Sequence, residues 1–200
     1  MADDKLAQRD RSRARYEQVL DAASLCFRRD GFHGASIAEI SKHAGMSAGH
    51  IYHFFANKEA IIAAIVNRQV EYWINLIAQF EQADDVFGAM TERVATGVNE
   101  RVAEEFVGLW LEILAEGARN PRVGAVLREA DARVRAILTH VIEVALEARG
   151  QRTPAVEAAA IEVVMAMFEG ITNRAVLNPG FDRNEAARVL EAALVAVLAI

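Results

Sequence analysis

The pattern of apolar and polar residues over positions 35–60 predicts two short helices separated by a tight turn. Ser36, with Glu39 three residues later, has the spacing of a capping box at a helix start. Ile40 and Ala44 continue an apolar face at helical spacing. Gly45 then ends the helix, because glycine tolerates a positive φ at little cost. We therefore expect an amphipathic helix just before Gly45.

The helix that follows, expected from Ser47 to Phe54, has two chemically different sides. Ile51 and Phe55 fall on the apolar side, and the other side carries Gly49, His50, Tyr52 and His53. A helix of about two turns is not stable alone, so its apolar side must pack against the protein. Helix, glycine turn and short helix with a polar outer face form the helix-turn-helix pattern. The alternative is a small helical hairpin within another all-α domain.

Helical periodicity continues through the rest of the chain, and no stretch alternates convincingly at period two. The sequence therefore predicts an all-α protein of about nine helices. The remaining helices are expected at residues 12–29, 58–80, 86–99, 103–118, 122–149, 154–177 and 183–200. We expect an N-terminal domain at residues 1–57 and a larger domain at residues 58–200. Residues 58–81 are the connecting helix, which a polar break at 82–85 follows.

Composition favours helices and excludes several classes of protein. The chain is 53% hydrophobic with only 3 prolines. Its single cysteine, Cys26, cannot form an internal disulfide and is expected in the core, with a redox-sensing thiol as the alternative. The first ten residues are polar, and no apolar run approaches the roughly 18 residues that span a bilayer. We expect a cytoplasmic protein without a signal peptide or a membrane partner.

Motifs of catalysis are missing from the sequence. It has no Gly-rich phosphate loop, no GxSxG motif and no Cys or His cluster with metal-binding spacing. His50 and His53 lie three residues apart, but no nearby acid or cysteine completes a metal site. We therefore expect no enzyme activity, no cofactor and no metal.

Charge is distributed unevenly along the chain, whose net charge is −6. Residues 5–58 contain nine Lys or Arg and five Asp or Glu, so this part carries +4 and the remainder carries −10. A basic end on an acidic body is expected when only one end contacts phosphate. The arginines at 9, 11, 13 and 15 fit either a solvated tail or a flexible arm that follows DNA.

The run from Val19 to Ile61 resembles the DNA-binding domain of the TetR family of bacterial transcriptional regulators, over about a quarter of the chain. The residues that carry the resemblance are Ala22, Ala23, Phe27, Gly31, Phe32, Ser36, Ile37, Glu39, Ile40, Ala44, Gly45, Met46, Ser47, Gly49, Ile51, Tyr52, Phe54, Phe55, Lys58 and Glu59. His50 departs from the pattern, since the family more often has a small residue there. This departure concerns which bases are read and leaves the mode of binding unchanged.

The resemblance implies that the helix at residues 47–54 enters the major groove of double-stranded operator DNA. Tyr52, His53 and His50 would reach phosphates or base edges, and Ser36, Ser47 and Lys58 would hold the DNA backbone. Lys58 lies in the first turn of a helix, where a cation is unfavourable to the dipole, so a phosphate is a natural partner. The full set of predicted DNA-binding residues is Arg13, Ser36, Lys42, Ser47, Ala48, Gly49, His50, Tyr52, His53 and Lys58.

A set of aromatic and other apolar residues in the larger domain fits either a plain core or an effector cavity. Such regulators commonly carry a cavity for a small molecule here, so the resemblance favours the cavity. The predicted lining is Trp73, Phe80, Met90, Phe106, Trp110, Ile113, His140, Met165 and Phe168. Residues 109–138 also resemble the BetI-like subgroup, although weakly.

The last two helices carry more apolar surface than a one-sided helix needs, which suggests an interface. In the TetR family the corresponding helices pair in a homodimer. The predicted interface is Val163, Met167, Ile171, Val189, Ala193, Leu194 and Val197. The sequence thus predicts a homodimeric regulator, a repressor released from a palindromic operator by a small hydrophobic effector. The alternatives are an activator or effector-independent regulator, and a helical lipid- or acyl-binding protein without DNA binding.

Overall fold

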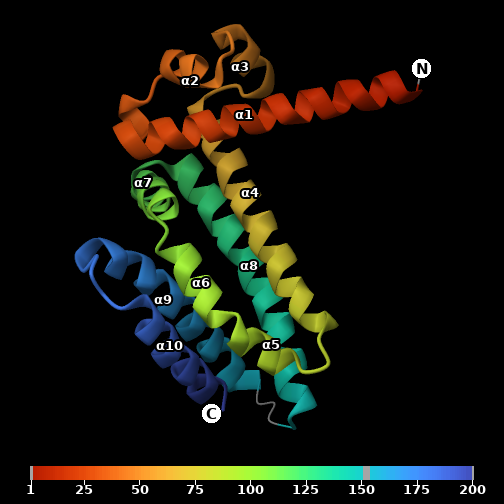
Figure 1. Ribbon diagram of the computed structural model, residues 1–200, viewed down its shortest axis with the longest axis vertical. Coiled ribbons are helices and arrows are strands. Elements are labelled where there is room, and N and C mark those ends of the chain that lie inside the picture. Colours follow the sequence, from red (N-terminus) through yellow and green to blue (C-terminus); the bar gives the residue numbers. More distant parts are fainter. Residues whose placement is uncertain (1, 151–153, 200) are drawn as a thin grey trace. The chain divides into compact units, whose positions relative to one another are not determined.

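The computed structural model describes residues 2–150 and 154–199, and the described residues form helices and connecting turns without a strand (Figure 1). The all-α prediction is confirmed. The elements are α1 (Ala2–Gly34), α2 (Ile37–Ala44), α3 (Ala48–Phe54), α4 (Lys58–Ala78), the 3-10 helix η1 (Gln79–Gln82), α5 (Val86–Glu92), α6 (Val94–Arg101), α7 (Glu104–Arg119), α8 (Pro121–Ala148), α9 (Pro154–Leu177) and α10 (Arg183–Leu198). None of the described helices is both long enough and apolar enough to cross a membrane.

The chain divides into two compact units. Unit 1 consists of Met1–Arg68 and Gly108–Arg128, and unit 2 consists of Gln69–Val107 and Glu129–Ile200. Helices α4, α7 and α8 therefore each contribute residues to both units. The predicted boundary between residues 57 and 58, which separates a DNA-binding domain from an effector domain, stays a prediction.

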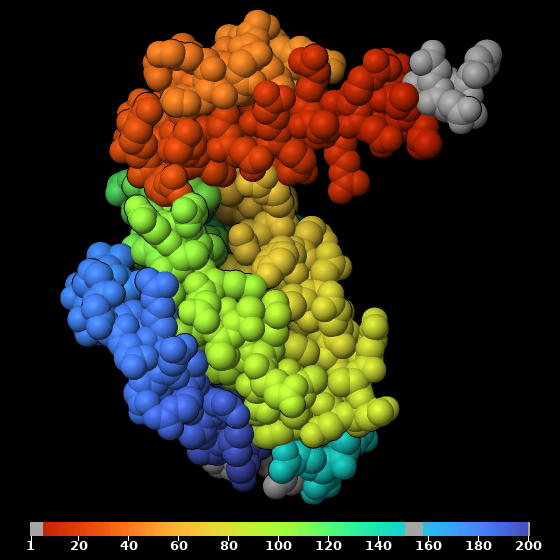
Figure 2. Space-filling view, in the orientation of Figure 1, coloured from red at the N-terminus to blue at the C-terminus, as the bar shows by residue number. Residues whose placement is uncertain are grey.

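In unit 1, α1 begins earlier than the sequence predicted. The helix was expected from residue 12, but it begins at Ala2, because neither proline nor glycine interrupts the chain before Gly31. Residues 6–15 are exposed on every side of this helix and stand clear of the rest of the unit in Figure 2. The basic run, for which the sequence allowed either a solvated tail or a flexible arm, is thus helical. Gly31 interrupts α1 with a φ of 71°, at the place where the sequence predicted its end.

The core of unit 1 gathers the apolar sides of α1, α2, α3 and α4. Its fully buried side chains include Phe27, Ile40, Ile51 and Ile62. Cys26 is also buried there, as predicted. Because α3 has only seven residues, this packing is what keeps it folded.

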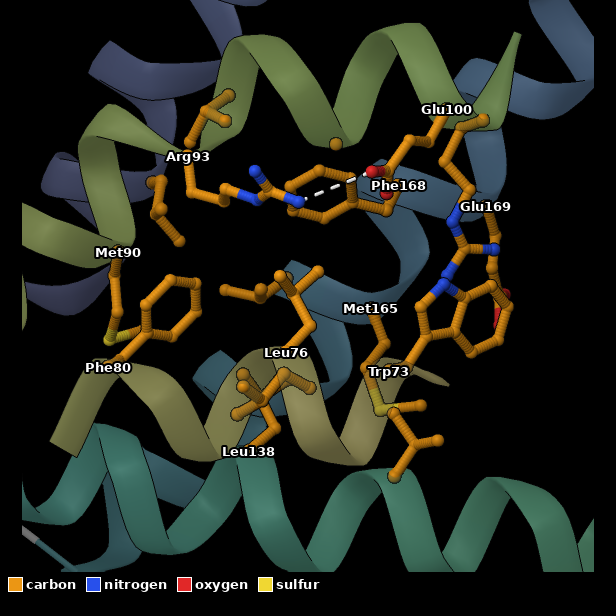
Figure 3. A pocket seen from close by; sticks show the side chains of 17 residues that line it. Trp73, Leu76, Phe80, Met90, Arg93, Glu100, Leu138, Met165, Phe168 and Glu169 are labelled. Carbon is orange, nitrogen blue, oxygen red and sulfur yellow. Dashed lines mark hydrogen bonds and ion pairs between the residues drawn. The ribbon is translucent and has the colours of Figure 1, made fainter. Parts of the chain in front are cut away.

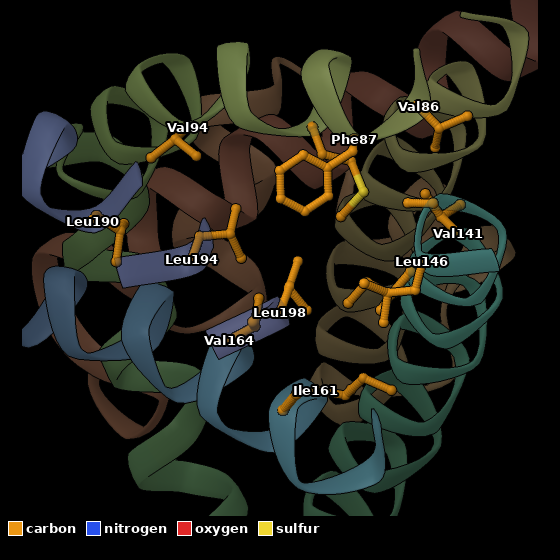
Figure 4. Close-up of a cluster of buried hydrophobic side chains, with 14 of the residues drawn as sticks. Val86, Phe87, Val94, Val141, Leu146, Ile161, Val164, Leu190, Leu194 and Leu198 are labelled. Carbon is orange, nitrogen blue, oxygen red and sulfur yellow. The ribbon is translucent and has the colours of Figure 1, made fainter. Parts of the chain in front are cut away.

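The core of unit 2 is formed by α5, α6, α9 and α10 with parts of α4 and α8. In Figure 4, Leu194 and Leu198 of α10 and Val164 of α9 point toward Phe87 of α5. The single helix predicted at residues 86–99 is two helices, α5 and α6, which meet at Arg93. The prediction of a single helix is therefore wrong. The break was missed because no proline or glycine marks it at Arg93.

Candidate nucleic-acid interface and ligand cavity

Helices α2 and α3 are each held at their ends by the residues that the sequence predicted. The Ser36 hydroxyl accepts a hydrogen bond from Glu39 N at 3.1 Å, and the Ser47 hydroxyl accepts one from His50 N at 3.2 Å. Gly45 ends α2 in the left-handed conformation, with a φ of 60°. The Glu39 side chain lies 3.8 Å from Arg29 instead of completing the capping box. These local bonds set the turn between α2 and α3.

Helix α3 separates its apolar and polar side chains as the sequence predicted. Ile51 and Phe55 are 0% and 4% exposed, and Tyr16 of α1 packs on the Phe55 ring, with 4.9 Å between ring centroids. Tyr52, on the opposite side, is 55% exposed, and His53 is exposed beside it. A short helix that is fixed by its apolar side thus presents a phenol and an imidazole to solvent.

The other predicted DNA-binding residues also lie in unit 1, and most of them are exposed. The exposed ones are Arg13, Ser36, Lys42, Ser47, Ala48 and Gly49, and His50 is half-buried. Their hydroxyl, ammonium, guanidinium and imidazole groups are the kinds of donor that contact phosphate oxygens.

Lys58 has partners within the protein. Its ammonium donates hydrogen bonds to the carbonyl oxygens of Phe32 at 2.6 Å and Ala35 at 2.9 Å. It also lies 4.5 Å from the centroid of the Phe32 ring. These carbonyls belong to the connection that runs from the Gly31 kink in α1 to the start of α2, residues 31–36. The ammonium therefore acts within the fold, and its predicted phosphate contact stays a prediction.

Two acidic residues of α7 hold the same connection and were missed by sequence reasoning. Glu112 accepts a hydrogen bond from Phe32 N at 2.7 Å. Glu116 is only 2% exposed, accepts a hydrogen bond from Asn120 Nδ2 at 3.0 Å, and lies 3.2 Å from His33 Nε2. The sequence shows only that Glu112 and Glu116 are two acids four residues apart in a mostly apolar helix. It does not show that they contact Phe32 and His33, which lie about 80 residues away along the chain.

Unit 2 contains a cavity of about 150 Å³ between α4, α6, α8 and α9. Figure 3 shows its mostly apolar wall, and five of the predicted effector-binding residues line it, namely Trp73, Phe80, Met90, Met165 and Phe168. Phe106 lines a neighbouring hollow of about 310 Å³, which shares Trp73 with the cavity.

The other three predicted effector-binding residues line neither the cavity nor the neighbouring hollow. Trp110 and Ile113 belong to unit 1, where Ile113 is buried in the core. His140 is exposed on α8, and its Nε2 lies 3.1 Å from a carboxylate oxygen of Glu81. Helical periodicity could not separate these residues from the lining, because it does not say which helices meet.

Charged residues line one part of the cavity, and the apolar pattern of the sequence did not point to them. They are Arg93, Glu100, Arg101 and Glu169. Glu100 accepts hydrogen bonds from the Tyr72 hydroxyl at 2.7 Å and from Arg93 Nη2 at 3.3 Å. The Arg101 guanidinium stacks 4.1 Å from the centroid of the Trp73 ring. Burial lowers the pKa of Arg101 to about 10, against the opposing influence of Glu169 and Glu100.

The predicted dimer residues divide into three groups. Val163 and Val189 are 43% and 61% exposed, and Met167, Ile171, Ala193 and Val197 are half-buried. Leu194 is 3% exposed and packs in the core of unit 2, so it is not part of the exposed surface of α10. Because α10 is apolar almost all round after Ala192, its sequence pattern there could not distinguish the core side from the outer side.

Comparison with known proteins relates the chain to bacterial regulators. The profile described as "Bacterial regulatory proteins, tetR family" matches residues 19–65, and the profile described as "BetI-type transcriptional repressor, C-terminal" matches residues 89–199. The HTH-type transcriptional regulator UidR of Escherichia coli (strain K12) is 34% identical over 111 residues, which are 56% of this chain and 56% of UidR. The chain thus spans about half the length of this curated relative.

Solved structures share the fold over nearly the whole chain. Salmonella enterica GusR is 26% identical, with a TM-score of 0.79 over 94% of this chain and 96% of GusR. The regulator FadR from Bacillus subtilis, in complex with stearoyl-CoA, is 17% identical, with a TM-score of 0.79 over 92% of this chain and 99% of FadR. The BetI-like resemblance of the sequence is confirmed by the BetI-type profile that matches residues 89–199.

Proposed function

Since the chain belongs to the TetR family of bacterial regulatory proteins, we propose that it is a transcriptional regulator that places α3 in the major groove of operator DNA. The observation that carries the proposal is the division of α3 into two sides. Ile51 and Phe55 are buried, whereas Tyr52 and His53 are exposed. Groups that can donate hydrogen bonds are thus displayed on a helix held from behind.

Exposed cations in unit 1 support the same proposal. Arg9, Arg11, Arg13 and Arg15 follow one another along an exposed part of α1, and Lys42 is exposed at the end of α2. Phosphate contacts from such side chains supply most of the sequence-independent affinity of a DNA-binding protein. The helical form of residues 6–15 makes them a preformed arm, which would contact DNA without the entropy cost of ordering a flexible one.

We propose further that the regulator is a homodimer formed through α9 and α10. Four valines of these helices are substantially exposed, namely Val163, Val176, Val189 and Val195. An exposed apolar surface of this kind is typical of an interface. A two-fold symmetric dimer would recognise a palindromic operator, whose half-sites lie about one helical turn apart or a multiple of it.

The proposed regulation is release of the operator by a small effector that binds in the cavity of unit 2. Helix α4 contributes Lys58 to the connection that precedes the helix-turn-helix and Trp73 to the cavity wall. A helix that supplies residues to both sites is a physical route for coupling. The effector can act only through different affinities for the operator-bound and released conformations.

The test is selection of bound sequences from a random duplex library, followed by affinity measurements at increasing salt. We expect a palindromic consensus and an affinity that falls steeply with salt. Tyr52→Ala should weaken binding to the consensus while leaving the circular dichroism spectrum and the oligomeric state unchanged. A protein that enriches no sequence and has no salt-dependent DNA affinity would instead fit the helical lipid-binding alternative.

A further inference from the structure

The cavity of unit 2 has an arginine whose guanidinium lies against two aromatic rings. The Arg101 guanidinium lies over the Trp73 ring at 4.1 Å and over the Phe106 ring at 5.4 Å, measured to the ring centroids. It makes no hydrogen bond or ion pair to any other residue within the described part of the chain. A guanidinium carries five donors in a rigid fork. Arg101 is thus oriented by aromatic stacking while its fork is unused.

Arg101 keeps its positive charge in the wall of the cavity, although the side chain is partly buried. Its pKa of about 10 lies below the ordinary value because burial removes water, yet the group is still protonated at neutral pH. A cation that has lost part of its hydration gains most from an acceptor that replaces the water. An oxyanion of a bound molecule meets this need.

The neighbouring carboxylates do not take the place of such an acceptor. The same Glu100 oxygen already accepts hydrogen bonds from Tyr72 and Arg93. Glu169 is exposed, so water screens its charge. In addition, Arg93 Nε is buried and has no hydrogen-bond partner among the described residues. This end of the cavity therefore has a surplus of unused donors.

Most of the remaining wall is apolar, so the rest of a bound molecule should be apolar too. Leu76, Phe80, Leu138 and Phe168 are among the side chains that face the cavity in Figure 3. A cavity of about 150 Å³ accommodates a group of the size of one aromatic ring. The neighbouring hollow shares Trp73, Glu100 and Arg101 with it, so the guanidinium lies where the two spaces meet.

We infer that this cavity binds an amphipathic organic anion, whose ring-sized apolar body lies among Leu76, Phe80 and Phe168 and whose oxyanion pairs with the Arg101 guanidinium. The inference rests on the proposed function only in treating this molecule as the effector. Carboxylates and phosphates share the geometry that fits the guanidinium fork. A cationic ligand is disfavoured, because Arg101 already covers the face of Trp73 that would attract it.

Calorimetric titration of the full-length protein with phenylacetate, phenylacetamide and phenethylamine tests the charge preference, since these probes share a ring. Phenyl phosphate distinguishes a phosphate from a carboxylate as the preferred head group. We expect phenylacetate or phenyl phosphate to bind at least about 10-fold more tightly than phenylacetamide, and phenethylamine to bind most weakly. Equal binding of the acid and the amide, tighter binding of the amine, or no binding of either anion would overturn the inference.

Two substitutions of Arg101 and one matched control test whether Arg101 causes the preference for anionic probes. Arg101→Met should weaken binding of the preferred anion about 10-fold or more, with less than about a twofold effect on phenylacetamide. Arg101→Lys keeps the charge but loses the fork, so it should retain part of the preference. Arg149 also stacks on an aromatic ring, that of Phe87 at 4.1 Å, but lies outside the cavity lining. Arg149→Met should therefore leave binding of both probes unchanged.

Operator binding separates this inference from the proposed function. If an anion binds in an Arg101-dependent manner but does not change operator affinity, the cavity assignment stands and the proposed release mechanism fails. If the protein binds its operator but the charge preference survives in Arg101→Met, the inference fails and the proposed DNA-binding function is untouched.

Discussion

The Glu112 carboxylate of α7 accepts a hydrogen bond from the backbone N–H of Phe32 at 2.7 Å, although the two residues are 80 positions apart. The carbonyl of Phe32 accepts a hydrogen bond from the Lys58 ammonium at 2.6 Å. Phe32, directly after the Gly31 kink in α1, is therefore held through both of its backbone groups. Gly31, which precedes it, provides the positive φ that brings the N–H toward Glu112.

Removal of the Glu112 acceptor should destabilise unit 1. Glu112→Ala leaves the partly buried N–H of Phe32 without a partner, and we expect a loss of about 1–3 kcal/mol in the free energy of unfolding. Glu112→Gln keeps an acceptor oxygen and should cost less. Urea unfolding followed by circular dichroism measures both, and Glu105→Ala, at an exposed position of the same helix, is the control. Equal stability of all three variants would show that this bond contributes little.

Lys58 and Lys42 should differ in how they affect DNA binding. Lys58→Met removes two hydrogen bonds to backbone carbonyls, so we expect lower stability and an unchanged salt dependence of operator affinity. Lys42→Met, at an exposed position, should leave stability unchanged and reduce the slope of log affinity against log salt by about 1. Affinity titrations at several salt concentrations measure the slopes. A reduced slope for Lys58→Met would show that its ammonium also contacts phosphate.

His53→Ala should weaken operator binding, because His53 is exposed beside Tyr52 on the polar side of α3, where its ring can donate a hydrogen bond to a phosphate or a base edge. His140→Ala, at an exposed histidine in unit 2, should leave operator affinity unchanged. Anisotropy titrations with operator DNA measure both affinities. An unchanged affinity for His53→Ala would contradict the prediction.

Two neighbouring apolar residues of α10 should have different roles. Val189→Glu places a charge on an exposed valine and should convert the proposed dimer to a monomer in light scattering. Leu194→Ala removes a buried side chain, so it should leave the oligomeric state intact and lower the free energy of unfolding by about 2–5 kcal/mol. Leu25→Glu, at a partly exposed position of α1, is the control for added charge. A dimer that persists in Val189→Glu would place the interface elsewhere.

The local features of the fold could be predicted because the groups involved are neighbours in the sequence. Ser36 and Ser47 bond backbone N–H groups three residues away, and Asn57 caps α4 in the same way, through a 2.8 Å bond from Ala60 N. The positive φ of Gly45 follows from the residue type. The two sides of α3 followed from helical spacing, since Ile51 and Phe55 recur at the period of the helix.

Features that depend on which helices meet required the tertiary structure. Periodicity places Val189 and Leu194 on an apolar helix, but only the packing of α10 buries Leu194 and exposes Val189. Likewise, Lys58 is a cation at a helix start in the sequence, and only the fold brings it to the Phe32 carbonyl. Arg101 became a candidate ligand contact because α4 and α6 bring it over Trp73.

The sequence by itself thus determined the helical class, the helix caps and the two sides of α3, because hydrogen bonds and spacing within a few residues set them. The tertiary structure decided which apolar residues are core, which charges are paired and where a cavity lies. These outcomes depend on contacts between distant segments, whose free energies come from burial and from partners that no local pattern specifies.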